Sequence, residues 1–330
     1  MRSIEIGLSA VMAFALACAA PPTARAEDAA LGEQIVDTMN RLWGAHPGLR
    51  ANHTKGVVVE GSFTPSGAGA SLTTAALFHG APTPATVRFS NATGLPDLAD
   101  GAPNANPHGM AVRFHLADGG EMDIVANSLK FFPVATGPEF RDLLQAAAAS
   151  GPGTPKPTKL DAFLADHPAA PRAMSSAATP TSFARETYNG VNAFVLVDSA
   201  GRRRPFRFRL APVAGEAHLS KEEAAKQPPD FLVDGLRAEL AQGPVRFRLL
   251  AQLAAPGDPT GDATQPWPDD RELVDLGEIA LTKPVADTAA AEKDLLFLPS
   301  NLAEGVEPSD DPLIAVRDEA YAVSFGRRSP

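Results

Sequence analysis

Cysteine is almost absent from this 330-residue chain, since Cys18 is the only one. It lies in the apolar amino-terminal stretch, so a chain cut after residue 26 has no thiol, which excludes disulfide bonds and thiolate metal sites. Positive charge is also scarce, with 29 Lys and Arg against 39 Asp and Glu. An acidic chain without a basic cluster is a poor match for nucleic acid or an anionic membrane, and we expect neither as a partner.

The amino-terminal stretch has the pattern of a signal peptide. A basic start precedes an apolar run at 7–20, and residues 24–26 read Ala-Arg-Ala, which suits a signal peptidase. The run is short for a membrane span, so an anchor is the less favoured reading. A lipoprotein site at Cys18 is also less favoured, because no branched apolar residue stands three positions before it. We therefore predict a removed signal peptide at 1–26, a single domain at 27–330 and a periplasmic protein without a membrane anchor.

Eight short strand-like runs, separated by Gly, Pro, Asn and Asp, fill the middle of the chain. They form two groups of four, at 55–63, 83–92, 109–118 and 120–127, and at 192–201, 204–212, 244–253 and 275–282. Helices are expected between and around these groups, at 137–150, 159–168, 220–243 (interrupted by two prolines) and 313–325. The pattern predicts an α+β fold, a closed antiparallel eight-stranded β-barrel with flanking helices. Closure leaves no strand edge free to pair between molecules.

Tyrosine occurs only twice, and Tyr321 stands four residues after Arg317 near the end of the chain. On a helix over 313–325 these two side chains are neighbours one turn apart. A guanidinium beside a phenol favours the ionised phenolate. On this spacing alone, a packing tyrosine beside a solvated arginine is the better interpretation, because Arg-x-x-x-Tyr is a common pattern.

Three further stretches carry candidate site residues. "RANHTKG" lies directly before a strand, "VRFSNA" puts an arginine and a serine on one strand face because side chains alternate, and "ANSLKFF" ends a strand. The candidates in and near these stretches are Arg50, His53, Arg88, Ser90, Asn127, Phe131, Phe132 and Phe140. Taken singly, each has an ordinary structural explanation as a strand cap, a surface or turn residue, or a core aromatic.

Together, these stretches and the carboxy-terminal "DPLIAVRDEAYAVSFGRR" resemble the haem-containing catalase family, in the family's order and over roughly 45–330. The last stretch looks like the small catalase-related peroxidases in particular. The resemblance implies a catalase-like haem domain with haem b as its cofactor, and an enzyme that acts on peroxide.

The resemblance also implies a role for each candidate. Tyr321 would ligate the haem iron as a phenolate, with Arg317 keeping it ionised. His53 would be the acid and base on the opposite face of the haem, with Ser90 setting its tautomer and Asn127 orienting the peroxide. The remaining residues would bind the haem, the arginines through its propionates and the phenylalanines by lining its pocket: Arg50, Arg88, Arg328, Phe131, Phe132 and Phe140.

Two features depart from the large catalases. The sequence ends nine residues after Tyr321, where large catalases continue into a helical region. From this we expect no NADPH, and a monomer or homodimer. Asn52 precedes His53 where dismutating catalases have a small apolar residue, which suggests a shift from peroxide dismutation towards other oxidations.

The expected function is that of a haem peroxidase that reduces hydrogen peroxide or organic hydroperoxides with a small organic electron donor, with weak catalase activity. Two alternatives stay open. One is a haem-dependent fatty-acid hydroperoxide isomerase of the allene oxide synthase kind. The other is a non-enzymatic barrel that binds small apolar ligands, in which the candidate residues merely pack.

Overall fold

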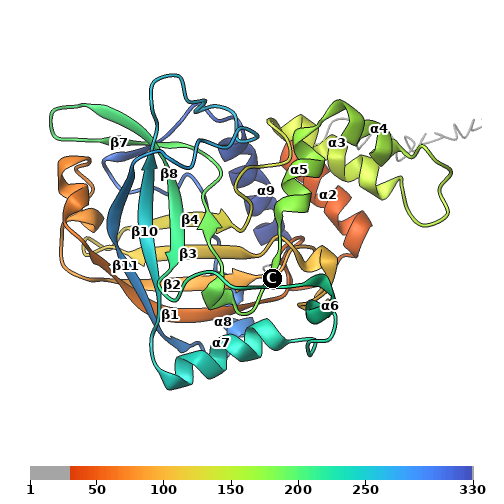
Figure 1. The fold of residues 1–330 in the computed structure, drawn as a ribbon, viewed down its shortest axis with the longest axis horizontal. Helices are drawn as coiled ribbons and strands as arrows, with labels where there is room; N and C mark the ends of the chain where they lie inside the picture. Colours follow the sequence, from red (N-terminus) through yellow and green to blue (C-terminus); the bar gives the residue numbers. More distant parts are fainter. Residues whose placement is uncertain (1–29, 329–330) are drawn as a thin grey trace, which may run out of the picture. The chain divides into compact units, whose positions relative to one another are not determined.

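An antiparallel sheet that closes on itself forms the centre of the structure (Figure 1). The computed structural model describes residues 30–328, and the predicted signal peptide lies outside this range. The main strands overlap the eight predicted ones: β1 (Gly56–Pro65), β2 (Thr83–Ser90), β3 (Gly109–His115), β4 (Glu121–Asn127), β7 (Phe194–Val197), β8 (Arg203–Pro212), β10 (Val245–Leu253) and β11 (Leu273–Pro284). Shorter strands are β5 (Thr179–Pro180), β6 (Tyr188–Asn189), β9 (His218–Leu219) and β12 (Val306–Pro308).

The barrel closes through a strand that is split in two. β6 pairs with β4 through Asn127 and with β8 through Leu210, and β7 then continues along β8. β8 pairs in turn with β10, β10 with β11, and β11 with β1, so the ring is complete. The predicted closed eight-stranded barrel with flanking helices is confirmed. The strand expected at 192–201 is preceded by the two-residue piece β6, and it is this piece that joins the two halves of the barrel.

Large apolar side chains fill the barrel interior. Phe63, Phe89 and Phe114 are fully buried in one cluster with many other strand residues, and the rings of Phe63 and Phe114 meet edge-on at 5.4 Å between centroids. Because side chains alternate along a strand, an inward Phe89 turns its neighbours Arg88 and Ser90 to the outer face of β2. The hydrophobic core therefore fixes the direction in which the polar residues of β2 point.

Helices flank the barrel on several sides (Figure 1). They are α2 (Leu31–Trp43), α3 (Gly137–Ala148), α4 (Lys159–Asp166), α5 (Ala169–Ser176), α6 (Lys221–Ala224), α7 (Phe231–Gln242), α8 (Thr288–Asp294) and α9 (Leu313–Arg328), with 3-10 turns at Ala68–Ser71, Ala76–Phe78, Pro103–Ala105 and Phe183–Arg185. Figure 1 shows α2, α3 and α9 on the same side of the barrel. Apolar residues of these three helices form a second, smaller cluster. None of the helices between residues 30 and 328 is long and apolar enough to cross a membrane.

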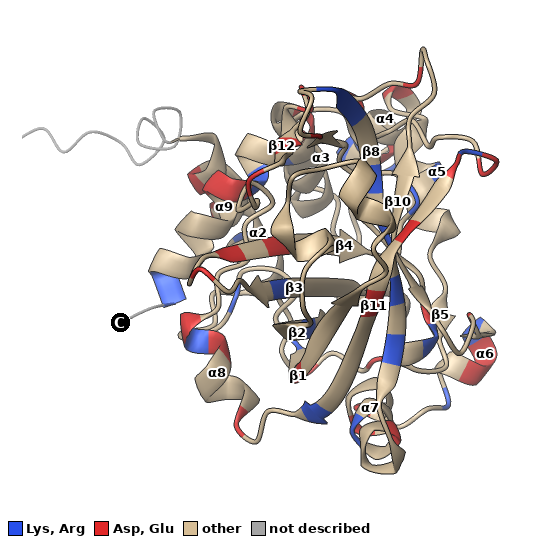
Figure 2. Cartoon of the chain, turned by 90° about the vertical axis from the view of Figure 1, so that its left-hand side faces the viewer, with Lys and Arg blue, Asp and Glu red and all other residues tan. Residues whose placement is uncertain are grey.

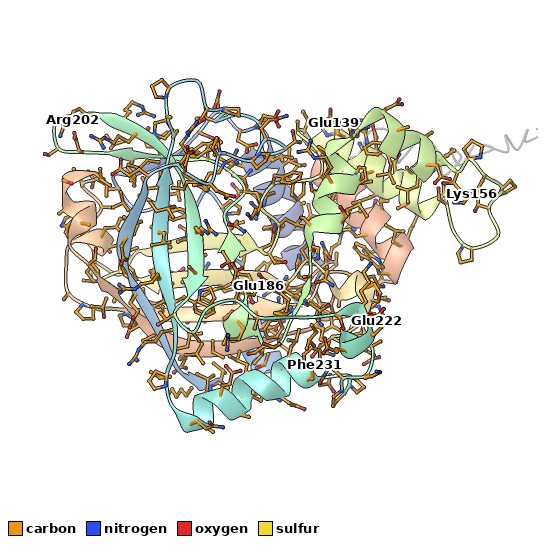
Figure 3. All side chains as sticks on the ribbon, in the orientation of Figure 1. Glu139, Lys156, Glu186, Arg202, Glu222 and Phe231 are labelled. Atoms are coloured by element: carbon orange, nitrogen blue, oxygen red, sulfur yellow. The ribbon has the colours of Figure 1, made fainter. Side chains whose placement is uncertain are left out.

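Local sequence explains where several helices begin and end. Thr136 and Glu139 form a reciprocal capping box at the start of α3, where Figure 3 labels Glu139. Pro228 and Pro229 separate α6 from α7, as expected from the missing backbone donors of proline. Asp311 accepts a hydrogen bond from the backbone N–H of Leu313 at 2.9 Å and thereby caps α9. α2, α5 and α8 were not expected from the sequence.

Candidate active site

A cavity lies between the outer face of the barrel and the helices α2, α3 and α9. It contains about 1220 Å³ of empty space, part of it open to solvent. α2 contributes an apolar wall of Ile35, Val36 and Met39, and α9 contributes a second wall. The predicted site residues that line the cavity are Arg50, His53, Arg88, Ser90, Asn127, Phe132, Phe140, Arg317, Tyr321 and Arg328.

Phe131 is the exception among the predicted residues. Its ring lies 5.3 Å from the guanidinium carbon of Arg172, and it lines a different cavity together with Trp267. The neighbouring Phe132 lines the main cavity and packs on Phe140, with 5.4 Å between the ring centroids. Of the three phenylalanines expected in the pocket, Phe132 and Phe140 line this cavity and Phe131 does not.

The loop before β1 holds His53 in an unusual backbone conformation. His53 has a φ of 54°, in the left-handed region that non-glycine residues rarely adopt. The Asn52 side-chain oxygen accepts a hydrogen bond from the His53 backbone N–H at 2.9 Å. Arg88 donates through Nη2 to the carbonyl oxygens of His53 at 2.8 Å and Thr54 at 3.2 Å. Surrounding contacts thus enforce a strained conformation at the cavity wall, a frequent feature of functional sites.

The imidazole of His53 is held by Ser90. The distance from His53 Nδ1 to Ser90 Oγ is 3.1 Å. Gly109 on β3 lies against this pair, because a Cβ at its position would stand 2.8 Å from Ser90 Oγ and 3.2 Å from His53 Nδ1. A residue larger than glycine would force the serine and the histidine apart. The requirement for glycine at 109 was missed at the sequence level.

His53 is electrically neutral at neutral pH. Burial of the ring, followed by the positive charges of Arg88 and Arg317, lowers the pKa of His53 from 6.5 to about 4. The side chain is deeply enclosed by protein, and it keeps part of its surface open to the cavity that it lines. A neutral, partly accessible imidazole can accept a proton from a bound molecule and return it.

Tyr321 and Arg317, both on α9, form a second group of side chains that line the cavity. Arg317 Nε donates a hydrogen bond to Tyr321 Oη at 3.1 Å, as the four-residue spacing predicts. The barrel orients this arginine, because its other nitrogens donate to Asn192 Oδ1 and to the carbonyl oxygen of Val125. Asn192 in turn donates to Asp311, at 2.8 Å, the residue that caps α9. The phenol of Tyr321 is therefore held in place by a chain of contacts that reaches the barrel.

The second tyrosine of the chain is unlike the first. Tyr188 is fully buried in the barrel core, and its hydroxyl donates to the carbonyl oxygen of Phe183 at 2.9 Å. Tyr188 is thus a packing residue with a satisfied hydroxyl, whereas Tyr321 faces the cavity.

Asn127 ends β4 at the cavity wall. Its side-chain oxygen accepts a hydrogen bond from the backbone N–H of Leu129 at 2.8 Å. The amide nitrogen remains as the donor that Asn127 can offer to a molecule in the cavity.

Arg50, Arg88 and Arg328 form an arginine cluster at the cavity. Arg50 and Arg328 both donate to the carbonyl oxygen of Leu295, at 2.9 and 2.5 Å. Glu292 on α8 pairs with Arg88 at 2.8 Å and with Arg50 at 3.6 Å. Burial and the neighbouring cations lower the pKa of Arg50 to about 8 and that of Arg328 to about 10. One carboxylate beside three guanidinium groups leaves the cluster with an excess of positive charge.

The buried donors of this cluster are not all used. Within the described part of the chain, the Nε atoms of Arg50, Arg88 and Arg328 are buried and make no hydrogen bond. Buried donors without acceptors are costly. The cluster is therefore suited to a ligand that brings carboxylate oxygens into the cavity.

Comparison with known proteins agrees with this geometry. A family model described as "Catalase" matches residues 34–328. A "Catalase-related peroxidase" of Mycolicibacterium paratuberculosis is 36% identical over 301 residues, which cover 90% of this chain and 94% of the relative. A "Catalase-related peroxidase" of Synechococcus elongatus is 30% identical over 302 residues, covering 90% and 88%.

Solved structures show the same fold. A bacterial catalase superposes with a TM-score of 0.75 at 22% identity, over 85% of this chain and 57% of the other. A fungal catalase gives a TM-score of 0.74 at 23% identity, over 85% and 59%. The chain thus spans less than two thirds of the length of these two catalases.

We expect the free energy of unfolding to decrease as the pH falls from about 6.5 towards 4, in part because of His53. The pKa of His53 is about 4 in the folded protein, so in this window the unfolded chain binds a proton that the folded chain does not. Because of this proton, the free energy of unfolding falls by up to about 1.4 kcal/mol for each unit by which the pH decreases. Denaturant unfolding at several pH values should give a steeper decrease for the wild type than for His53→Gln. Equal slopes would contradict a depressed pKa for His53.

Proposed function

The chain belongs to the catalase family, and from this premise we propose that it is a haem peroxidase in the catalase-related branch. It reduces hydrogen peroxide or organic hydroperoxides with a small organic electron donor, and has weak catalase activity. The observation that carries the proposal is one cavity lined both by a tyrosine–arginine pair on α9 and by a neutral histidine on the loop before β1. The two relatives named catalase-related peroxidase support the same reaction class.

The lining residues fit haem b. Tyr321, with Arg317 Nε donating to its oxygen, offers an anionic ligand for ferric iron. The unsatisfied Nε donors of Arg50 and Arg328 call for the carboxylate oxygens that propionates provide. Apolar walls from α2 and α9, with Phe132 and Phe140, suit the porphyrin faces. When bound, haem supplies the iron at which the peroxide bond is broken and stores the oxidising equivalents until the donor returns two electrons.

His53 moves the protons of this reaction. Its neutral imidazole accepts the proton of one peroxide oxygen and returns it to the other oxygen, which leaves as water or as an alcohol. The contact between Nδ1 and Ser90 Oγ holds the ring in one orientation. Because the pKa of His53 is about 4, the base form is present throughout the physiological pH range.

The neighbouring residues position the reactants. The amide nitrogen of Asn127 donates to a peroxide oxygen and orients it towards His53. Arg317 holds the oxygen of Tyr321 in place, since a guanidinium N–H donates to it. Phe132 and Phe140 pack together and limit the access of water to the cavity.

We also propose that the protein is exported. The support is the sequence pattern of residues 1–26, with a basic start, an apolar run and an Ala-Arg-Ala site. The remaining chain, 27–330, then acts as a single haem domain in the periplasm, where peroxide from outside the cell arrives first.

Replacing His53 with glutamine should lower the rate of peroxide reduction by about 10² to 10⁴, the usual contribution of a general acid and base. The measurement is the rate of peroxide consumption by the haem-loaded protein in the presence of an oxidisable phenol. His79→Gln is the matched control, because His79 is an exposed residue outside the cavity lining, and it should keep the wild-type rate.

Equal rates for the two variants would contradict the proposed function. The same assay distinguishes the isomerase alternative. With a fatty-acid hydroperoxide and no donor, an isomerase accumulates a rearranged product, whereas a peroxidase turns over only when the donor is added.

Replacing Asn52 with valine should increase oxygen release from hydrogen peroxide relative to oxidation of the donor. Asn52 binds the His53 backbone and brings a polar side chain into the cavity wall, and valine removes that polarity beside His53. Oxygen evolution and donor oxidation are measured on the same preparation. Asn52→Ser, which keeps a polar group, is the control. No increase in oxygen release for Asn52→Val would count against this role for Asn52.

A further inference from the structure

Glu292 occupies the carboxylate-binding edge of Arg88. Its two oxygens meet two different nitrogens of the guanidinium, with Oε1 2.8 Å from Nε and Oε2 3.1 Å from Nη2. Nη2 donates a hydrogen bond to Oε2, whereas the contact of Nε with Oε1 is a close ion pair without hydrogen-bond geometry. Glu292 thus occupies the edge by which arginine binds carboxylates without satisfying it completely. The side chains of Glu292 and Arg88 are 15% and 4% exposed, so the pair is largely shielded from water. A second carboxylate cannot use the same edge of Arg88 while Glu292 is there.

The same segment also offers an acceptor to the other two arginines. Three residues after Glu292, the carbonyl oxygen of Leu295 accepts from both Arg50 and Arg328. The next two residues, Leu296 and Phe297, line the cavity. The stretch from 292 to 297 thus provides internal acceptors at the place where the proposed function puts the propionates. Figure 2 shows α8, which carries Glu292, close to the carboxyl end of α9.

α8 is held to the barrel only lightly. In Thr288–Asp294, all of which the structure describes, no residue is buried. The Thr288 hydroxyl accepts a 3.4 Å hydrogen bond from the Val58 backbone, at the long end of the range. A short helix with little buried surface can move at small cost. Glu292 can therefore leave Arg88 without a rearrangement of the barrel.

We propose that Glu292 is an internal competitor for the carboxylates of the cofactor. It neutralises Arg88 and Arg50 while the cavity holds no cofactor, and a propionate takes its place on the Nε–Nη2 edge of Arg88 when haem binds. This inference rests on the proposed function, because it requires a ligand with carboxylates in the cavity. Glu292 then sets how tightly and how selectively the protein loads haem, without contacting peroxide.

Competition has a definite thermodynamic signature. Removing the competitor destabilises the cofactor-free protein, which then has three unpaired cations, but leaves the loaded protein unchanged. If the loaded protein is unchanged, thermodynamic linkage makes two changes equal. The factor by which the folding equilibrium constant of the cofactor-free protein falls equals the factor by which the association constant for haem rises. A residue with a purely structural role would instead destabilise both forms alike and leave the affinity unchanged.

The test is a titration of cofactor-free protein with haem, followed by visible absorption, for wild type and Glu292→Gln. The variant should bind haem at least about tenfold more tightly, the scale of one charge-assisted hydrogen bond. Its melting temperature should fall in the cofactor-free form and stay at the wild-type value in the loaded form. Asp294→Asn is the matched control, since it removes the same charge from an exposed position of the same helix, and it should change neither quantity.

A second ligand separates competition from a general effect on the cavity. In haem dimethyl ester both propionates are blocked, so no carboxylate competes with Glu292. The affinity gain of Glu292→Gln should therefore appear with haem and be absent with the ester. If Glu292→Gln does not fold, Glu292→Asp keeps the charge with a shorter reach, and should give a smaller gain that is again confined to haem.

Equal gains with haem and its ester, or equal loss of stability in both forms, would overturn the role of Glu292 and leave the haem site intact. A wild-type protein that binds no haem in the same titration would overturn both this inference and the proposed function.

Discussion

Four arginine side chains line one cavity. Because buried charge is costly, these arginines favour neutral or negatively charged groups beside them. Burial of the ring, followed by the charges of Arg88 and Arg317, lowers the pKa of His53, so the imidazole stays neutral and can work as a base. Arg317 donates a hydrogen bond to the oxygen of Tyr321. Arg50, Arg88 and Arg328 leave a positive excess that calls for carboxylates. One concentration of charge thus touches the histidine, the tyrosine and the arginine cluster of the cavity.

The barrel makes this concentration of charge possible. Its closed ring and phenylalanine-rich interior fix β2, so that Arg88 and Ser90 point outwards at a set spacing. Gly109 on the adjacent strand leaves room for the pair of Ser90 and His53. Arg88 connects the loop that carries His53 with helix α8, because it binds the backbone of that loop as well as Glu292. The loop can keep its strained conformation because a rigid strand supports it.

Much of the site could be predicted from the sequence, because its pairs lie within one element. The contact between Arg317 and Tyr321 follows from helical spacing, and the shared direction of Arg88 and Ser90 follows from strand alternation. Phe131 and Phe132 could not be told apart, since they lie after β4 in a segment without a regular period. The order of the motifs along the chain identified the family, and the barrel followed from the eight strands.

The residues that were missed are partners supplied from distant parts of the chain. Asn192 holds Arg317 from 125 positions away, and Glu292 reaches Arg88 from 204 positions away. Neither residue stands in a pattern that marks it as a partner of an arginine, and α8 is too short and too alanine-rich to give a clear helical period. Such contacts depend on the tertiary fold.

The central claim is that the oxygen of Tyr321 is the protein's ligand to haem iron, and resonance Raman spectroscopy of the loaded protein tests it most directly. The spectrum should contain iron–phenolate bands in the wild type. The bands should also be present in Tyr188→Phe, because the Tyr188 hydroxyl of the wild type is buried in the barrel core. The bands should be absent from Tyr321→Phe. Bands that persist in Tyr321→Phe, or that are missing from the wild type, would contradict the account.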